Sequence, residues 1–392
     1  MTRGLRRVAA RALALLLGLL LVEGLLRLAQ VAYPAFDRPT PGLRRWGIPD
    51  AEGWAVGESR TWVKLNVQGA RDVDHEIAKP ANTLRIVVVG DSYTDAFEVE
   101  REESFPAVAE RRLAACPALA GRSVETINLG RRGYGTTEEL LALRRFGFAY
   151  DPDWVVLAFL TGNDFRNNSR ALQGSDRPYH VYDEDGTLVL DESYMESADF
   201  QRWTGWRGDL WYGLLNRSRL FQLLRHLERR IKGLLESAAR ESEGEGFEPG
   251  LDDRVYLEPE DAAWRSAWRV TEGVIRQMHE EVRAHDARFL LLTLSNAIQV
   301  HPDRALRERH RRRIGARDLF YPDRRLRSFA EQQGIDALVL APELRAWAER
   351  KETCVHGFQE PWLCRGHWNA VGHRLAGERL AERICAALEA RP

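Results

Sequence analysis

The stretch Arg85–Asp95 constrains the fold of this chain more than any other. Its first five residues, Arg85–Val89, are rich in β-branched side chains and predict a buried strand that stops abruptly at Gly90-Asp91-Ser92. A strand that ends on Gly-Asp-Ser places a hydroxyl at the carboxyl end of a sheet, where open α/β folds build their sites. Ser92 is therefore either a nucleophile or a turn residue, and the rest of the sequence has to distinguish the two.

Four further apolar runs predict strands, and helical patterns separate them. The strands are expected at residues 124–129, 154–160, 288–294 and 337–340. Helices are expected at residues 104–113, 136–148, 260–285, 322–333, 343–349 and 370–388. This alternation predicts an α/β fold in which helices cover both faces of a five-stranded parallel sheet.

Two regions depart from the alternation. Residues 34–80 are rich in Gly, Pro and Trp with little periodicity, and we expect an extended membrane-proximal segment that lies against the main domain. The main domain, residues 81–390, is interrupted by an insertion or cap at residues 166–260. Within the insertion the sequence predicts a hairpin around Asp183–Gly186, a helix at 214–239 and a flexible linker at 241–247.

Residues 1–33 have the pattern of an export signal. An apolar run at residues 12–22 follows a basic end that contains Arg3, Arg6, Arg7 and Arg11. The absence of a clean small-x-small cleavage site between Gln30 and Asp37 favours a signal anchor, with its N-terminus inside, over a cleaved peptide. The first reading predicts a membrane-anchored domain on the periplasmic side, and the second a secreted one. Both place Ser92 outside the cytoplasm.

Charge and residue spacing give no support for nucleic acid, a metal or a cofactor. The chain has 57 Lys and Arg against 58 Asp and Glu, so its net charge of −1 gives no reason to expect nucleic acid as a partner. No group of His, Asp or Glu shows the spacing of metal ligands. We therefore expect neither a metal nor a cofactor.

The four cysteines contain no Cys-x-x-Cys pair, which excludes a zinc ribbon or thioredoxin motif. Cys354 and Cys364 could close a small loop. Cys116 and Cys385 fall on the first and last predicted helices of the sheet domain, which share one face in a flavodoxin-like fold, so they could bridge. Four free thiols are the alternative.

The loops after the predicted strands carry the groups that acyl transfer needs. A serine hydroxyl is a poor nucleophile until a base takes its proton, and His367, in the loop before the last helix, can act as that base. The resulting oxyanion requires preorganised donors. The backbone N–H groups of Ser92 and Gly133 and the side-chain amide of Asn163 could supply them.

These motifs resemble those of the SGNH (GDSL) hydrolases. The matching pieces are Gly90-Asp-Ser92, Asn128-Leu-Gly-Arg-Arg-Gly133, Gly162-Asn-Asp164 and His367-Trp-Asn-x-x-Gly-His373, in the family's order across residues 84–385. The resemblance implies a three-layer flavodoxin-like fold and a serine esterase mechanism. It assigns the nucleophile to Ser92, the base to His367, and oxyanion-hole roles to Gly133 and Asn163. Gly130 is a second candidate for the glycine role, and Asp91 and Asp164 are expected to support turns.

The sequence departs from the family at one place. The family usually has an Asp two or three residues before the catalytic His, where this chain has Arg365 and Cys364. An Asp there holds the imidazole tautomer and stabilises the imidazolium, which an Arg cannot do. The acid is then missing, replaced by a backbone carbonyl, or supplied from elsewhere, with Glu360 and Asp336 as candidates. We expect a Ser–His dyad to be the working unit.

Three functions fit these features. The first is an exported serine esterase that removes an acyl group, such as acetyl, from a cell-envelope glycan or lipid. The second is an O-acyltransferase of polysaccharide assembly, in which a sugar hydroxyl replaces water. The third is an inactive glycan-binding or scaffold protein, for which Arg365 is the main support.

Overall fold

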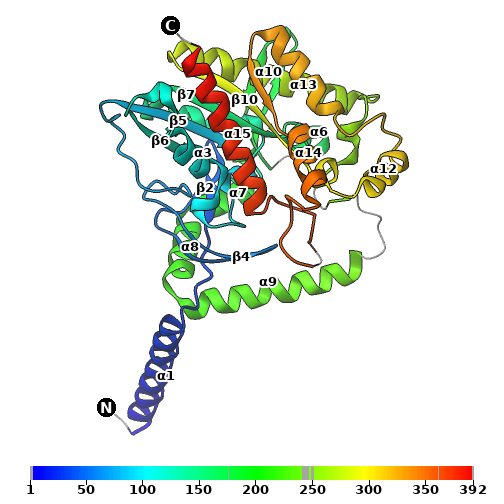
Figure 1. The fold of residues 1–392 in the computed structure, drawn as a ribbon. Helices are drawn as coiled ribbons and strands as arrows, with labels where there is room; N and C mark the ends of the chain where they lie inside the picture. The colour runs from blue at the N-terminus through cyan, green and yellow to red at the C-terminus, as the bar shows by residue number, and fades with distance from the viewer. Residues whose placement is uncertain (1–2, 175, 241–246, 249–250, 361, 391–392) are drawn as a thin grey trace.

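A five-stranded parallel sheet forms the centre of the molecule (Figure 1). The computed structural model describes residues 3–174, 176–240, 247–248, 251–360 and 362–390. The strands are ordered β11-β10-β7-β5-β6. In chain order this is the 2-1-3-4-5 arrangement of flavodoxin-like sheets, so the predicted fold class is confirmed. The strands are β5 (Thr83–Gly90), β6 (Ser123–Asn128), β7 (Trp154–Leu160), β10 (Arg288–Leu294) and β11 (Asp336–Val339).

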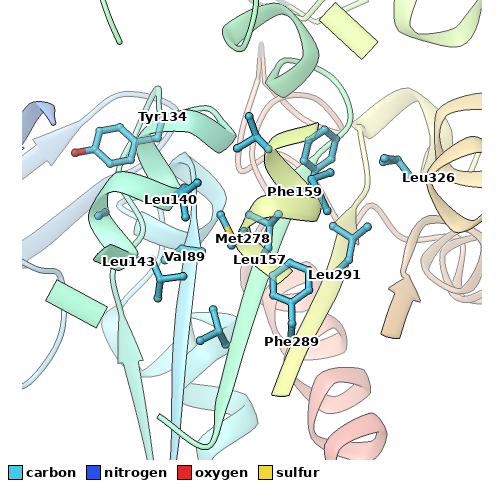
Figure 2. Close-up of a cluster of buried hydrophobic side chains, with 14 of the residues drawn as sticks. Val89, Tyr134, Leu140, Leu143, Leu157, Phe159, Met278, Phe289, Leu291 and Leu326 are labelled. Carbon is cyan, nitrogen blue, oxygen red and sulfur yellow. The ribbon is translucent and has the colours of Figure 1, made fainter. Parts of the chain in front are cut away.

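Helices cover both faces of the sheet because its strands are apolar on both sides. Val87 and Val89 of β5 belong to one buried cluster, and Ile86 and Val88 to a second. The first cluster lies under α4 (Thr136–Ala142), α10 (Ala262–Ala284) and α13 (Tyr321–Gln333), and the second under α3 (Phe105–Leu113), α14 (Ala341–Lys351) and α15 (Ala370–Glu389). Figure 2 shows the first cluster, in which Val89, Leu157 and Leu291 of three strands meet Leu140 and Met278 of two helices.

Short helices follow or connect the strands. They are α2 (Ser92–Asp95), α5 (Asp164–Asn167), α6 (Arg170–Gln173), α11 (Ala297–Val300) and α12 (Arg304–Arg313). The helix expected at 136–148 keeps α-geometry only as far as Ala142 and continues as a π-turn from Leu143 to Gly147.

Residues 34–80 are more structured than the sequence suggested. They form two antiparallel hairpins, β1 (Asp37–Thr40) with β2 (Arg44–Gly47), and β3 (Glu52–Val56) with β4 (Arg60–Lys64). The alternating strand pattern is short and contains several glycines, which is why periodicity alone did not reveal it. The description of this region as an extended segment was therefore wrong in its secondary structure.

The insertion begins as the sequence predicts and then differs in its helices. The hairpin around Asp183–Gly186 is present as β8 (Tyr179–Tyr182) and β9 (Leu188–Asp191). Three helices follow it, α7 (Ala198–Thr204), α8 (Trp206–Arg217) and α9 (Arg219–Arg240). Residues 241–246 of the expected linker lie outside the described residues.

The single helix expected at 214–239 is divided at Ser218. Ser218 is extended, with φ −106° and ψ 117°, and its hydroxyl accepts a hydrogen bond from the Phe221 N–H at 3.2 Å. Asn216, just before the break, exchanges two hydrogen bonds with the Ala35 backbone. These partners lie far away in sequence, so the local helical pattern carried no sign of the break.

Helix α1 (Arg3–Leu28) projects from the rest of the molecule (Figure 1). None of its residues is buried, and by length and composition it could cross a membrane. At about 1.5 Å per residue, a helix of 26 residues is longer than the hydrocarbon core of a bilayer is thick, which is roughly 30 Å.

All four cysteines are paired. Cys116 bonds Cys385 across 269 residues, with Cα atoms 5.8 Å apart, and Cys354 bonds Cys364. The first bond joins the segment just after α3 to α15, and these two helices lie side by side on one face of the sheet. The predicted bridge is therefore present, and the alternative of four free thiols is wrong for this structure.

Removing the long-range disulfide is expected to lower the stability of the domain. In the variant Cys116→Ser/Cys385→Ser we expect the free energy of unfolding to fall by about 2–4 kcal/mol, because the bond restricts a very long loop in the unfolded chain. Denaturant unfolding of the full chain in detergent measures this. The matched variant Cys354→Ser/Cys364→Ser removes a bond between cysteines only 10 residues apart in the sequence, so its free energy of unfolding should fall by less. Equal or reversed losses would contradict the expectation.

Candidate active site

Ser92 begins α2 directly after β5. The Asp91 carboxylate caps this short helix by accepting a hydrogen bond from the Tyr93 N–H at 2.9 Å. Gly90 is required at the end of the strand, because a Cβ there would lie 2.2 Å from the Thr94 hydroxyl and 2.9 Å from the Ala158 carbonyl. The tight turn fixes the serine at the carboxyl edge of the sheet, as the sequence predicts.

A continuous hydrogen-bonded chain joins three side chains at this edge. The Ser92 hydroxyl lies 2.8 Å from His367 Nε2, and His367 Nδ1 lies 2.9 Å from Glu58 Oε1. The other Glu58 oxygen accepts a hydrogen bond from the His367 backbone N–H at 2.8 Å. The carboxylate therefore fixes both the position of the His367 backbone and the tautomer of its ring.

Glu58 lies in the turn between β3 and β4. The neighbouring Ser59 donates a hydrogen bond to the Glu98 carbonyl at 2.7 Å, which holds the turn against the loop after α2. Gly366 leaves room for the carboxylate, because a Cβ at this position would lie 2.3 Å from Glu58 Oε2. Gly366 also has φ +73°, a conformation that favours glycine.

The charges around His367 favour its protonated form. Burial lowers the pKa of His367, but the negative charge of Glu98 and the hydrogen bond and charge of Glu58 outweigh it and raise the pKa to about 9. Burial acts to raise the pKa of Glu58, and the hydrogen bonds and charge of His367 reverse this effect and lower it. The pair is therefore arranged to stabilise an imidazolium beside a carboxylate.

The turn after β6 contains one backbone donor that has no acceptor among the described residues. The N–H of Gly130 donates to Asn128 Oδ1, and those of Arg131 and Arg132 donate to the Gly90 carbonyl and to Asp95. The N–H groups of Tyr134 and Gly135 are likewise occupied. Among the described residues, the Gly133 N–H is the one in this turn without an acceptor, and Gly133 has φ +72°. The Gly133 N–H, and not that of Gly130, is thus open to a ligand.

Two arginines from outside the sheet hold this turn in place. Arg44 of β2 and Arg177 of the insertion both donate to the Gly133 carbonyl, at 3.1 and 2.9 Å. Gly130 has a packing role, since a Cβ on it would lie 2.5 Å from the Thr94 Cβ.

Asn163 follows β7 and turns its side chain toward the same edge. Its amide nitrogen donates to Asp91 Oδ2 at 3.3 Å, which leaves a second amide hydrogen available. Asp164 is fully buried and accepts a hydrogen bond from the Leu160 N–H at 2.8 Å. Asp91 and Asp164 therefore shape the turns around the site, as expected.

The loop that carries His367 is held by several internal contacts. The Cys354–Cys364 bond closes it. His356 is buried within it, and its two ring nitrogens lie 2.6 Å from the Gly366 carbonyl and 3.1 Å from the Ser295 hydroxyl. Burial lowers the pKa of His356 to about 3, so this ring is neutral and structural.

Arg365 does not occupy the place of the missing acid. Its guanidinium lies 4.9 Å from the centre of the Phe247 ring. The two acids considered from the sequence also lie apart from the imidazole: Asp336 pairs with Arg383 of α15, and no contact joins Glu360 to His367 among the described residues.

The expectation of a Ser–His dyad missed Glu58, which lies 309 residues before His367 in the sequence. One signal could have revealed it. Two short runs that contain Trp and Val, Gly53–Val56 and Thr61–Val63, stand on either side of the Gly-containing stretch Gly57-Glu58-Ser59, the pattern of a hairpin with an acid at its tip. Even so, the sequence alone does not say which loop this tip would reach.

Comparison with known proteins adds a likeness of overall shape. No family model and no curated protein matches the chain. An acetyl xylan esterase is similar at 14% identity over 77% of this chain and 100% of that chain, with a TM-score of 0.39. An acetylxylan esterase from Geobacillus stearothermophilus is similar at 12% identity over 79% of this chain and 96% of that chain, with a TM-score of 0.37. A protein described as a lipolytic member of the G-D-S-L family from Desulfitobacterium hafniense is similar at 12% identity over 76% of this chain and 98% of that chain, with a TM-score of 0.34. Because these identities and TM-scores are low, the function has to rest on the geometry of the site.

Proposed function

We propose that this protein is a serine esterase that hydrolyses an acyl ester on a cell-envelope glycan or lipid outside the cytoplasm. The observation that carries the proposal is the hydrogen-bonded chain from Ser92 through His367 to Glu58. A nucleophile, a base and an orienting acid in this order are the parts of a serine hydrolase triad. The presence of an acid also removes the main support for an inactive scaffold.

The geometry supports a two-step reaction. His367 Nε2 takes the proton of the Ser92 hydroxyl as the oxygen attacks the ester carbonyl, and Glu58 stabilises the resulting imidazolium. Collapse of the tetrahedral intermediate releases the alcohol, which receives that proton. Water then attacks the acyl-enzyme, with His367 as base, and releases the acid and free Ser92. Each oxyanion is met by the N–H groups of Ser92 and Gly133 and by the Asn163 amide.

A cavity near Gly133 supports a carbohydrate as the substrate. It has a volume of about 640 Å³. It is lined by Arg132 of the turn, by Arg44, which donates to the Gly133 carbonyl, and by aromatic side chains that include Tyr194, Trp203 and Tyr212. Ser92, Asn163 and His367 are not among its lining residues, so the cavity lies beside the catalytic side chains. Aromatic faces and guanidinium groups together suit the apolar faces and hydroxyls of sugars. Helix α1 supports the location, because it would hold this cavity close to a membrane surface.

Labelling with a fluorophosphonate probe tests the proposed activity. The full chain in detergent should be labelled at Ser92, release acetate from acetylated xylan and cleave p-nitrophenyl acetate, whereas Ser92→Ala should do none of these. Ser328→Ala, at an exposed serine on α13, serves as the matched control and should behave like the unmodified chain. A folded protein that the probe does not label would contradict the proposal. Adding an acceptor sugar and analysing the products distinguishes hydrolysis from the alternative of acyl transfer.

The side-chain donor of the oxyanion hole gives a further prediction. Asn163→Ala should lower kcat by about 10²–10³-fold with a smaller change in KM, because this donor acts mainly on the transition state. Steady-state kinetics with p-nitrophenyl acetate measure the effect. Asn82→Ala, at an exposed loop position, is the control and should retain full activity. A change confined to KM would contradict the assigned role.

A further inference from the structure

Helix α9 is amphipathic, and its apolar face points away from the protein. Leu220, Leu224, Leu227 and Ile231 follow one another at helical spacing. Leu224, Leu227 and Ile231 are 55%, 46% and 59% exposed. Helices of soluble proteins normally turn such a face toward the core. The exposed fractions show instead that this face has no partner within the described part of the chain.

The polar face of α9 is the one that contacts the domain. Gln222 is fully buried, and its side-chain oxygen accepts a hydrogen bond from the Tyr33 N–H at 2.8 Å. His226 stacks on the Tyr33 ring with ring centres 4.0 Å apart, and the Arg225 guanidinium lies over Trp211. These contacts fix the rotation of the helix and leave its leucines outside.

A direct contact joins the start of α9 to the end of α1. The Glu23 carboxylate of α1 accepts hydrogen bonds from the N–H groups of Arg219 and Leu220, at 3.0 and 3.1 Å, and from the Ser218 hydroxyl. A carboxylate is costly within the hydrocarbon of a bilayer, so a membrane-inserted α1 places Glu23 at the interface. The first turn of α9 then lies at the same level.

Shape and charge favour a lipid surface as the occupant of this face. Figure 1 shows α9 starting beside the end of α1 and running away from it at a steep angle, below the sheet domain. Arg230 and Lys232 lie on the two borders of the apolar face, and residues 219–233 contain five basic side chains and one acidic side chain. Helices that lie in a membrane interface combine an apolar face with basic borders in this way and favour anionic lipids.

We propose that α9 lies in the interface of the membrane that α1 enters, with its apolar face toward the acyl chains and its basic borders on anionic headgroups. The inference rests on α1 being a membrane anchor and is independent of the esterase activity. A second contact beside the spanning helix fixes the height and orientation of the domain above the bilayer.

The depth of a label on α9 tests this. The full chain carrying Leu227→Cys, labelled with an environment-sensitive fluorophore, is placed in nanodiscs that contain phosphatidylglycerol. The label is expected about 5–10 Å below the headgroups, quenched by lipid-borne nitroxide and protected from iodide. Ile77→Cys is the matched control, since Ile77 is 49% exposed and lies in the loop that contacts Arg85. Its label should respond to iodide alone. Ile231→Cys repeats the measurement at a second position.

Each other result would overturn the inference. Quenching by iodide alone at both Leu227 and Ile231 would place α9 in water. Protection from both quenchers would indicate a protein partner or a second copy of the chain. Equal depth in discs of phosphatidylcholine alone would contradict the role of the basic borders. A chain that does not enter discs would refute the anchor itself, and this outcome is visible before any quenching is measured.

Discussion

Replacing Glu58 with glutamine is expected to lower kcat/KM at neutral pH by about 10³–10⁴-fold. Glutamine keeps the size of the side chain, but it cannot stabilise the imidazolium that forms on His367, and it permits the wrong ring tautomer. Hydrolysis of p-nitrophenyl acetate by the full chain measures the loss. Fluorophosphonate labelling should slow in proportion, since the same proton transfer activates Ser92.

The same substitution should change the pH dependence of the reaction. In the proposed mechanism neutral His367 is the base, so the kcat/KM of the unmodified chain should rise with pH until the imidazolium has lost its proton, at about pH 9. The carboxylate of Glu58 contributes to that raised pKa of His367. Its removal should move the inflection to lower pH, while the plateau of the profile falls.

Glu98→Gln is the matched control, because it separates charge from contact. The charge of Glu98 raises the pKa of His367, yet its side chain makes no hydrogen bond to the imidazole. This variant should also move the inflection to lower pH but retain a plateau near that of the unmodified chain. A Glu58→Gln variant with an undiminished plateau would show that Ser92 and His367 work as a dyad.

The second large effect concerns stability and centres on Arg85. Its guanidinium is fully buried at the start of β5, where it pairs with Glu125 at 2.8 Å and donates to the carbonyls of Ile77 and Tyr150. Arg85→Met should lower the free energy of unfolding by about 2–4 kcal/mol, because the half-buried Glu125 carboxylate and several carbonyls lose their donor together. Denaturant unfolding in detergent, with the disulfides intact, measures the change.

Arg122→Met provides the comparison. Arg122 also donates to a backbone carbonyl of β5, that of Thr83 at 3.0 Å, but it stands at the more exposed rim of the sheet. Its replacement should cost no more than about 1 kcal/mol. If both variants unfold at the same denaturant concentration, the buried network around Arg85 contributes little to stability.

The sheet could be predicted because its signal is local. Runs such as Trp154–Leu160 and Arg288–Leu294 are apolar on both faces, as is typical of a strand that helices cover on both sides. Both strands have the predicted bounds. The division of the helix at Ser218 could not be predicted in this way. It depends on Asn216 contacting Ala35 and on Glu23 capping α9, and both partners come from the other end of the chain.

The candidate site shows the same contrast. Ser92, Asn163 and His367 follow strands or precede a helix, so chain order alone brings them to one edge of the sheet. Glu58 lies on a hairpin outside the sheet, and nothing in its neighbourhood indicates that the hairpin folds over the His367 loop. The local pattern can therefore indicate a hairpin, but it does not indicate which loop the tip of that hairpin contacts.

The place of Glu58 has a practical consequence for producing this protein in soluble form. Its hairpin is attached to the residues that follow α1, since the Trp54 N–H donates to the Ala32 carbonyl at 2.7 Å and the Trp54 ring N–H donates to the Gln30 carbonyl. A fragment trimmed to the sheet domain at residue 81 would retain Ser92 and His367 but lose their carboxylate. Truncation for crystallisation or assay should therefore fall within α1, before Gln30, or the recovered protein will misrepresent the activity of the intact chain.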